Sequence, residues 1–464
     1  MKEAIINLIA LSAWSPYSEL NFFHRSILKG AFSFLDVATI YAKGIAAIVL
    51  PYLLFFTKGW GFWSYCFLAW SMSELLFYLI QLSRLNSLSL QLPPTLTNDK
   101  ERVSIAHQLL EHIEDIGLDL QGWFRDSNSI NGVHLKTFSI YAFFDKLPGA
   151  LNHDELNNAQ EIYDMFQKRF RAKGNVTSEE TAVMFWPSLN PIPKELRSIV
   201  LYTGISVVKS LGFLAMNFSQ FKWRPLKSGL SYWIYTPSIL DQGHMPILFF
   251  HGIGFGPCQY IFHLNHLQRM YPNRIIISLT LPHITSAPHA EISSEISVLE
   301  AIDTIIQDND IKICSVVGHS FGTFIASWMM KWRRSYVGRV TMIDPVCFMT
   351  WDSSLYQRIL FTHPKNLIHH ISTRFIARDP VFASAITRHM NWNNSLTFPE
   401  IFDCPTNIFI SKKDWVIDAP KVYRYLQNRK MCTPMPNLNV TMLDITHIEY
   451  MFDPKLCGMI NSKV

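Results

Sequence analysis

This sequence has few charged residues, and its cysteines show no pairing pattern. Charged residues make up 17% of its 464 residues, whereas hydrophobic residues make up 49% and aromatic residues 14%. A typical soluble domain carries more charge and less apolar surface, so we expect part of the chain to contact a membrane. The formal net charge is only +5, from Lys and Arg that are dispersed along the chain. No concentrated basic face of the kind that binds nucleic acid is therefore predicted.

Disulfide, zinc and cofactor motifs are also lacking. The seven cysteines are odd in number and form no C-x-x-C pair, which predicts buried or free thiols and not a disulfide framework. The histidines of "IHH" at 368–370 have no carboxylate or cysteine at ligand spacing, so we predict no metal site there. We expect no cofactor and no metal.

Two long apolar segments lie between Val37 and Leu82. "VATIYAKGIAAIVLPYLLFF" contains one charge, Lys43, and "WGFWSYCFLAWSMSELLFYLIQL" contains one, Glu74. Each is long enough to cross a bilayer, so we predict residues 1–92 to be a membrane-anchor region with two candidate transmembrane helices. Charges inside a span are costly. A helical hairpin buried against the protein, or lying in the membrane interface, is therefore the alternative.

The rest of the chain divides into two regions. Residues 93–222 have helical patterns, beginning with a helix that Asn98 or Asp99 can cap, and we expect a helical linker or brace without catalytic motifs. From 223 to 464, β-rich runs such as "MPILFF", "KICSVV" and "TNIFIS" alternate with helical runs. This alternation predicts an α/β fold with a mostly parallel sheet covered by helices on both faces.

The stretch "SVVGHSFGTF" carries the first candidate for chemistry. Gly318, Ser320 and Gly322 fit the pattern G-x-S-x-G, between a predicted strand and a predicted helix. In that context the serine sits on a sharp turn that requires small neighbours and exposes its hydroxyl at the carboxyl end of the sheet. The nearby helix N-terminus favours negative charge. We therefore predict Ser320 as a nucleophile, in preference to an inert serine in a tight turn.

The glycine-rich stretch "HGIGFG" follows another predicted strand. His251, Gly252 and Gly254 belong to it, and its glycines let backbone N–H groups point toward the site. Such donors stabilise the oxyanion of an acyl-transfer intermediate. We predict the N–H groups of Ile253 and Phe321 as these donors.

The acid and the base follow later in the chain. Asp414 lies just past the strand "NIFIS", and His447 lies past the last strand, so the order Ser320, Asp414, His447 matches one known triad order. We favour Asp414 as the acid, with Asp344 as the next candidate and Asp418 as a third. Histidine has the right pKa to take and return a proton near neutrality.

Together these four elements resemble the α/β-hydrolase superfamily, over about residues 223–464. More narrowly, "LQGWF", "KWRPL", "HGIGFG", "IDPVCF" and "RHMNWNNSL" look like a family of eukaryotic, notably fungal, membrane-anchored α/β hydrolases. The resemblance implies the α/β-hydrolase fold, with an insertion at about 346–404 forming a helical lid over the serine.

The expected function is cleavage of an ester through a Ser-His-Asp triad and an acyl-enzyme. An apolar lid beside a membrane anchor favours a lipid-like or other apolar acyl substrate, with membrane lipid as a partner. Acyl transfer to an alcohol or amine is an open alternative, as is a non-catalytic membrane protein on the same fold. We expect an integral protein of an intracellular membrane such as the endoplasmic reticulum. If both apolar segments span, the positive charges that flank them place both ends, and so the catalytic domain, in the cytosol.

Overall fold

The computed structural model describes most of the chain. The described residues are 62–89, 98–113, 120–124, 130–146, 148–170, 183–188, 196–241, 243–361 and 379–464. The first predicted membrane segment, including Lys43, lies outside them.

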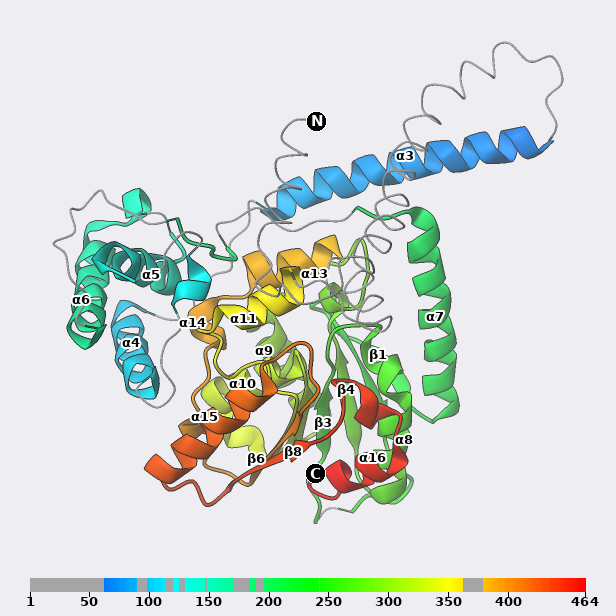
Figure 1. Ribbon diagram of the computed structural model, residues 1–464. Helices are drawn as coiled ribbons and strands as arrows, with labels where there is room; N and C mark the ends of the chain where they lie inside the picture. Colours follow the sequence, from blue (N-terminus) through cyan, green and yellow to red (C-terminus); the bar gives the residue numbers. More distant parts are fainter. Residues whose placement is uncertain are drawn as a thin grey trace, which may run out of the picture.

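An eight-stranded sheet forms the centre of the molecule (Figure 1), with the strand order β1-β2-β4-β3-β5-β6-β7-β8. All neighbours from β4 to β8 pair in parallel, and only β1 and β2 run antiparallel to their neighbours. The strands are β1 Lys222–Pro225, β2 Ser231–Tyr235, β3 Ile247–Phe250, β4 Ile276–Thr280, β5 Cys314–His319, β6 Val337–Ile343, β7 Thr406–Ser411 and β8 Leu438–Leu443. The mostly parallel sheet predicted from the alternating runs is confirmed.

Side chains alternate between the two faces of the sheet along each strand. Because both faces carry apolar side chains, helices cover both. Ile247 and Phe249 of β3 point into one core, whereas Leu248 and Phe250 point into the other. The helices that close these two cores are α8 Ile261–Met270 and α16 Pro454–Asn461 on the first face, and α9 Glu295–Asp308, α10 Gly322–Trp332 and α15 Ala419–Cys432 on the second.

The predicted helical brace packs beside this second core. Its helices are α4 Asp99–Ile113, α5 Gly132–Phe144 and α6 His153–Phe170. Asn98 begins α4 as expected, since its Oδ1 accepts from the N–H of Glu101 at 3.0 Å and its own N–H donates to the Glu101 carboxylate. The ring of Trp186 contacts those of Trp123 and Trp392 in tilted and edge-to-face arrangements, at centroid distances of 4.9 and 5.8 Å. Brace and lid therefore share one aromatic core.

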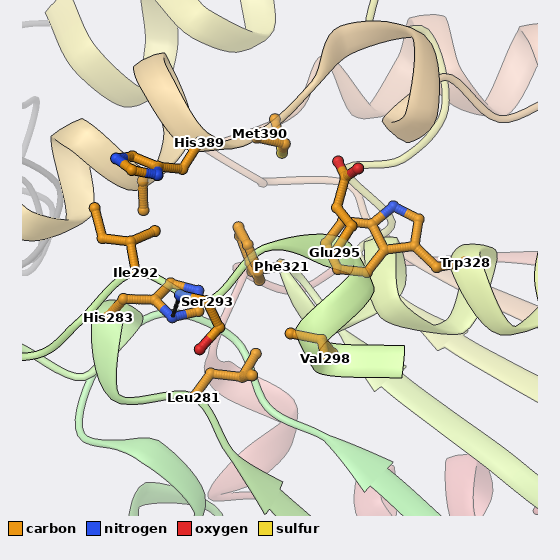
Figure 2. Close-up of a pocket in the computed structure, with 11 residues that line it drawn as sticks. Leu281, His283, Ile292, Ser293, Glu295, Val298, Phe321, Trp328, His389 and Met390 are labelled. Carbon is orange, nitrogen blue, oxygen red and sulfur yellow. Dashed lines mark hydrogen bonds between the residues drawn. The ribbon is translucent and has the colours of Figure 1, made fainter. Parts of the chain in front are cut away.

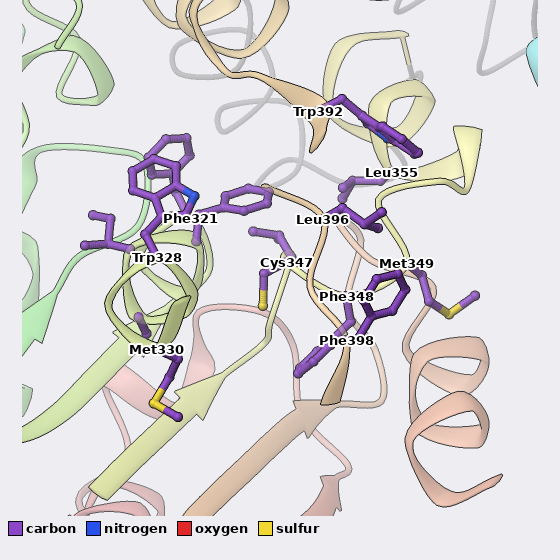
Figure 3. Close-up of a cluster of buried hydrophobic side chains, with 14 of the residues drawn as sticks. Phe321, Trp328, Met330, Cys347, Phe348, Met349, Leu355, Trp392, Leu396 and Phe398 are labelled. Atoms are coloured by element: carbon purple, nitrogen blue, oxygen red, sulfur yellow. The ribbon is translucent and has the colours of Figure 1, made fainter. Parts of the chain in front are cut away.

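The lid insertion crosses the carboxyl edge of the sheet (Figure 1). Its described helices are α11 Ser353–Tyr356, η6 Gln357–Phe361, α13 Pro380–Ser384, η8 Ala385–His389 and α14 Trp392–Ser395. Figure 3 shows side chains of the lid, including Leu355, Leu396 and Phe398, gathered in the same buried cluster as Trp328 of α10. In this conformation the apolar side chains of the lid are thus part of the hydrophobic core.

Two further helices lie at the periphery, α3 Phe62–Ser89 and α7 Ile199–Phe218. Glu74 of α3 is buried, and its Oε2 accepts a hydrogen bond from the N–H of Ile199 at 3.1 Å. A carboxylate at a helix N-terminus is favourable. Gln81 exchanges two hydrogen bonds with the backbone of Arg197, at 2.8 and 3.2 Å. One oxygen of the charge within the second apolar segment is therefore hydrogen-bonded inside the protein, as in the alternative to a membrane span, whereas Oε1 has no hydrogen-bond partner among the described residues.

Candidate active site

Ser320 lies in the sharp turn between β5 and α10. Its φ is 51°, in the left-handed region that side chains rarely adopt. The N–H of Ser320 donates to the carbonyl of Ile343 at 2.9 Å, which ties the turn to the end of β6. A Cβ at Gly322 would lie 2.1 Å from the carbonyl oxygen of Phe250, so glycine is required where α10 passes β3. The packed surroundings hold the strained turn in place.

His447 connects Ser320 with a carboxylate. Its Nε2 lies 3.0 Å from Ser320 Oγ, and its Nδ1 lies 2.7 Å from Asp414 Oδ2. Because the carboxylate accepts the proton on Nδ1, Nε2 is left to accept the proton of the serine hydroxyl. The structure thus brings the three residues together at the carboxyl ends of β5, β7 and β8.

A second carboxylate faces the same ring nitrogen. Asp344 Oδ2 lies 3.4 Å from His447 Nδ1, and its two oxygens accept from the N–H and the hydroxyl of Ser411 at 2.6 and 2.9 Å. Asp344 directly follows β6, and Asp414 comes shortly after β7. Because β6 and β7 pair in parallel, the two acids meet at the carboxyl edge of the sheet. Asp418, the third candidate, instead caps α15 by accepting from the N–H of Lys421 at 3.2 Å.

Burial and charge act in opposite directions on these groups. Burial raises the pKa of Asp344 to about 6 against the opposing effect of His447, and it raises the pKa of Asp414 as well. Burial alone would lower the pKa of His447, but the two nearby carboxylates outweigh it and raise that pKa. The two carboxylates therefore stabilise the imidazolium that forms when His447 takes a proton.

The glycine-rich loop lies directly against Ser320. A Cβ at Gly252 would lie 3.0 Å from Ser320 Cβ. Gly254 has a φ of 148°, and its N–H donates to the carbonyl of Ile284 at 3.0 Å. Within the part of the chain that the structure describes, the N–H groups of Ile253 and Phe321 have no hydrogen-bond acceptor. Both predicted oxyanion donors are therefore available to a ligand.

His251 fixes the start of this loop. One ring nitrogen, Nδ1, donates to the carbonyl of Gly252 at 2.7 Å, and Nε2 accepts from the N–H of Leu281 at 3.1 Å. Burial lowers the pKa of His251 to about 4, which keeps the ring neutral and able to make both bonds. Its role is thus to join the loop to the end of β4.

Sequence reasoning missed a buried chain of hydrogen bonds beneath the loop. His319 Nε2 donates to the carbonyl of His447 at 3.1 Å. Its Nδ1 must therefore accept from the Tyr260 hydroxyl, at 2.6 Å, and the same hydroxyl accepts from the N–H of Gly252 at 2.8 Å. The chain links the loop of the expected oxyanion donors to the backbone of the expected base. Tyr260 belongs to no known catalytic motif, so only the folded structure reveals these hydrogen bonds.

A small cavity lies beside Phe321 (Figure 2). Its volume is about 10 Å³, and apolar side chains such as Leu281, Ile292 and Val298 line it. The cavity is large enough for about one water molecule. Ser320 itself is only 3% exposed. An acyl group therefore cannot enter without movement of the surrounding side chains.

No protein-family model matches this chain, and no curated protein matches its sequence. Among solved structures, a bacterial membrane phospholipase A shares 12% identity over 57% of this chain and 91% of its own, with a TM-score of 0.38. A carboxylesterase from Bacillus subtilis shares 11% identity over 55% of this chain and 96% of its own, with a TM-score of 0.37. A carboxylesterase from Nitrososphaera gargenis shares 13% identity over 53% of this chain and all of its own (100%), with a TM-score of 0.36. These values are too low to assign a family or an activity.

One group of side chains has the composition of a metal site. Ligand atoms of His319, Asp344 and His447 lie within 4.8 Å of one another. They already bond within the protein, since His319 donates to the His447 carbonyl and His447 pairs with Asp414. A bound cation would disrupt these bonds, so we attribute the cluster to the hydrogen-bond network.

The raised pKa of His447 predicts a pH dependence. A base with a raised pKa stays protonated to higher pH, so the acidic limb of kcat/KM should have its midpoint above the ordinary histidine value of 6.5. Asp414→Asn should move this limb to lower pH, whereas Asp418→Asn should leave it in place. The measurement is kcat/KM for a p-nitrophenyl ester across pH. A limb at or below 6.5 would contradict the predicted influence of the two carboxylates.

Tyr260→Phe should slow the reaction by loosening the glycine-rich loop that carries the Ile253 N–H. The change removes the oxygen that accepts from Gly252 and leaves that buried N–H unpaired. We expect kcat to fall about tenfold with little change in KM, because removal of a single preorganised donor costs about 100-fold or more and loosening one costs less. Tyr235→Phe is the matched control, because among the described residues the Tyr235 hydroxyl bonds to the Pro272 carbonyl, at 3.0 Å, and to no other group. Equal kinetics of the two variants would exclude a positioning role for Tyr260.

Proposed function

We propose that this chain is a serine hydrolase of the α/β-hydrolase type that cleaves an ester through an acyl-enzyme. The observation that supports it best is the simultaneous contact of His447 with Ser320 Oγ and Asp414 Oδ2, at 3.0 and 2.7 Å. The two unpaired N–H groups beside the serine add to this support.

The reaction would proceed in two halves. Ser320 Oγ attacks the ester carbonyl carbon while His447 Nε2 takes the hydroxyl proton, and Asp414 stabilises the resulting imidazolium. The N–H groups of Ile253 and Phe321 bind the oxyanion. His447 then returns the proton to the leaving alcohol, which departs from the acyl-enzyme. Water attacks the acyl carbon with the same assistance and releases the acid and the serine.

We propose a lipid-like or other apolar acyl substrate. The side chains around Phe321 are mostly apolar, and the lid helices contribute further apolar surface to the same region. Such surface suits hydrocarbon, although His283, Glu295 and His389 also line the cavity. An alcohol that enters instead of water would convert the same acyl-enzyme chemistry into acyl transfer.

Two measurements test the function. The full-length protein should react with a fluorophosphonate probe, and it should hydrolyse p-nitrophenyl esters with kcat/KM rising from acetyl to longer acyl chains. Probe labelling without turnover of any ester in the series would overturn ester hydrolysis. Accumulation of an alkyl ester in the presence of a long-chain alcohol would identify acyl transfer.

We also propose that the protein is integral to an intracellular membrane, with the catalytic domain in the cytosol. The low charge of the chain and the first of its N-terminal apolar segments support this. Full-length protein should stay in the membrane pellet after alkaline carbonate extraction. Its appearance in the soluble fraction would contradict integral insertion.

The contacts of α3 predict where the chain can be shortened. Removal of residues 1–60 should leave a protein that still labels with the probe. Removal of residues 1–92 should lower the Tm, because it takes away Gln81 and Glu74, which accept from the N–H groups of Arg197 and Ile199. Thermal unfolding followed by circular dichroism compares the two. Equal Tm values would show that α3 adds nothing to the fold.

A further inference from the structure

Helix α7 is unusually apolar for a helix at the surface. It has 20 residues, Ile199–Phe218, and is therefore about 30 Å long. Its mean hydropathy is 1.7, yet only 17% of its most apolar window is buried. Among the described residues it is the one helix long and apolar enough to cross a membrane. Figure 1 shows it running along the side of the domain, outside the helices that cover the sheet.

One stripe of α7 is fixed to the domain. Tyr202, Ile205 and Met216 are buried, and a Cβ at Gly212 would lie 2.6 Å from Cys258 Cβ. With Lys209 these positions follow one another at intervals of three and four, so they form a single face of the helix. The opposite face is then the part of α7 that the rest of the described chain does not cover.

The single charge of α7 points inward. Lys209 Nζ donates to the carbonyl and to the hydroxyl of Thr285, both at 3.1 Å. Burial lowers the pKa of this ammonium, because its inward position removes the charge from water. The outward face consequently carries no charge along the whole helix, whereas a helix that faces water normally places charged residues there.

Large apolar side chains fill that outward face. The exposed fractions are 54% for Val207, 62% for Leu211 and 87% for Phe218. An open groove of about 470 Å³ extends the apolar surface between α7 and the sheet edge, with Leu214 and Trp223 in its lining.

Basic residues border this surface at the end of α7. Lys222, Arg224 and Lys227 are exposed, and the chain contains no acidic residue from 196 to 240. Trp223, 44% exposed, lies between the first two. Tryptophan and long cationic side chains are typical of the boundary between headgroups and acyl chains. Their positive charge complements lipid phosphate groups.

From these features we propose that α7 lies in the surface of a phospholipid bilayer, with its outward face among the acyl chains and the cations after it among the headgroups. A helix fixed to a domain along its length cannot be surrounded by lipid, so it lies along the membrane and does not cross it. A protein partner would be expected to meet a charged or polar rim on both sides of the helix. This proposal does not depend on the proposed ester chemistry.

The test places a fluorophore at single positions of the full-length protein in phosphatidylcholine–phosphatidylserine vesicles. Bimane is attached at Leu211→Cys or at Phe218→Cys, with the exposed Cys66 and Cys432 changed to serine. The control carries bimane on the native Cys432, at the end of α15, with only Cys66 changed. Because Leu211 and Phe218 are largely exposed, the cysteines should not disturb folding, which thermal unfolding checks.

Acyl-chain nitroxide lipids should quench positions 211 and 218 several-fold more strongly than position 432, and to a similar degree as each other. Aqueous iodide should quench only position 432. Iodide quenching at 211 would show a face in water, and protection from both quenchers would show cover by protein. A steep difference in lipid quenching between 211 and 218 would show a helix that crosses the bilayer. Each of these three results would overturn the proposal.

Discussion

Ser320→Ala should give a folded protein that neither reacts with a fluorophosphonate probe nor turns over an ester. Loss of Oγ removes the only nucleophile within reach of His447 Nε2, at 3.0 Å, among the described residues. Removal of a triad serine lowers kcat by about 10³- to 10⁶-fold. Labelling measured by in-gel fluorescence and kcat for a p-nitrophenyl ester provide the readouts.

Ser315→Ala is the matched control for this change. Ser315 is buried in β5, the strand that precedes Ser320, and its hydroxyl lies 3.5 Å from the carbonyl of Val464. This variant should label and turn over like the unchanged protein. Normal labelling of the Ser320 variant would remove Ser320 from the mechanism and leave it as an inert residue of a tight turn.

His447→Ala should be as damaging as Ser320→Ala, and Asp414→Asn should be less so. Loss of the base removes proton transfer altogether, at a cost of about 10⁴- to 10⁶-fold in kcat. In Asp414→Asn, the Asp344 carboxylate remains 3.4 Å from His447 Nδ1 and can accept its proton. We therefore expect a loss of about 10²- to 10³-fold, smaller than the roughly 10⁴-fold seen where a triad has one acid.

The double variant Asp344→Asn with Asp414→Asn decides whether the two acids share this role. It should lose about as much activity as His447→Ala, and more than the product of the two single losses. Asp418→Asn is the control, since Asp418 only caps α15 and pairs with Arg358. A large loss in Asp344→Asn with a tolerated Asp414→Asn would show that the acid was assigned to the wrong carboxylate.

The local parts of the site could be predicted from the sequence. Ser320, the glycine-rich loop and the strand that precedes each follow short patterns, because a sharp turn with close backbone contacts permits few residues. The parallel sheet was predictable for a similar reason, since alternating apolar runs and helices leave few other arrangements.

Features that depend on which strands are neighbours could not be predicted. Asp344 and Asp414 meet only because β6 and β7 pair, and no spacing in the sequence reveals that both would face His447. The bond between Tyr260 and His319 likewise joins a 3-10 helix to a strand 59 residues later. Helix α7 was expected only as part of a brace, because its pattern shows that it is helical but not which face stays uncovered.

Glu74 shows how a charge inside an apolar run can mislead. From the sequence it indicated either a costly charge within a membrane span or a contact inside the protein. Its hydrogen bond with Ile199 N–H depends on the start of a helix 125 residues away. Only the tertiary structure could reveal that partner.

Asp379 joins the lid to the peripheral helices. It caps α13 through the N–H of Val381 at 3.0 Å, accepts from the hydroxyl of Tyr202 at 2.7 Å, and lies 3.7 Å from Arg197. Outward movement of α13 would thus expose or unpair a buried carboxylate, and this cost would lower the population of an open form. A substrate that enters only the open form binds with an apparent affinity reduced by the fraction of open molecules. The strength of this one carboxylate's contacts would then set the substrate concentration at which the enzyme becomes half-saturated, without any contact between Asp379 and the substrate.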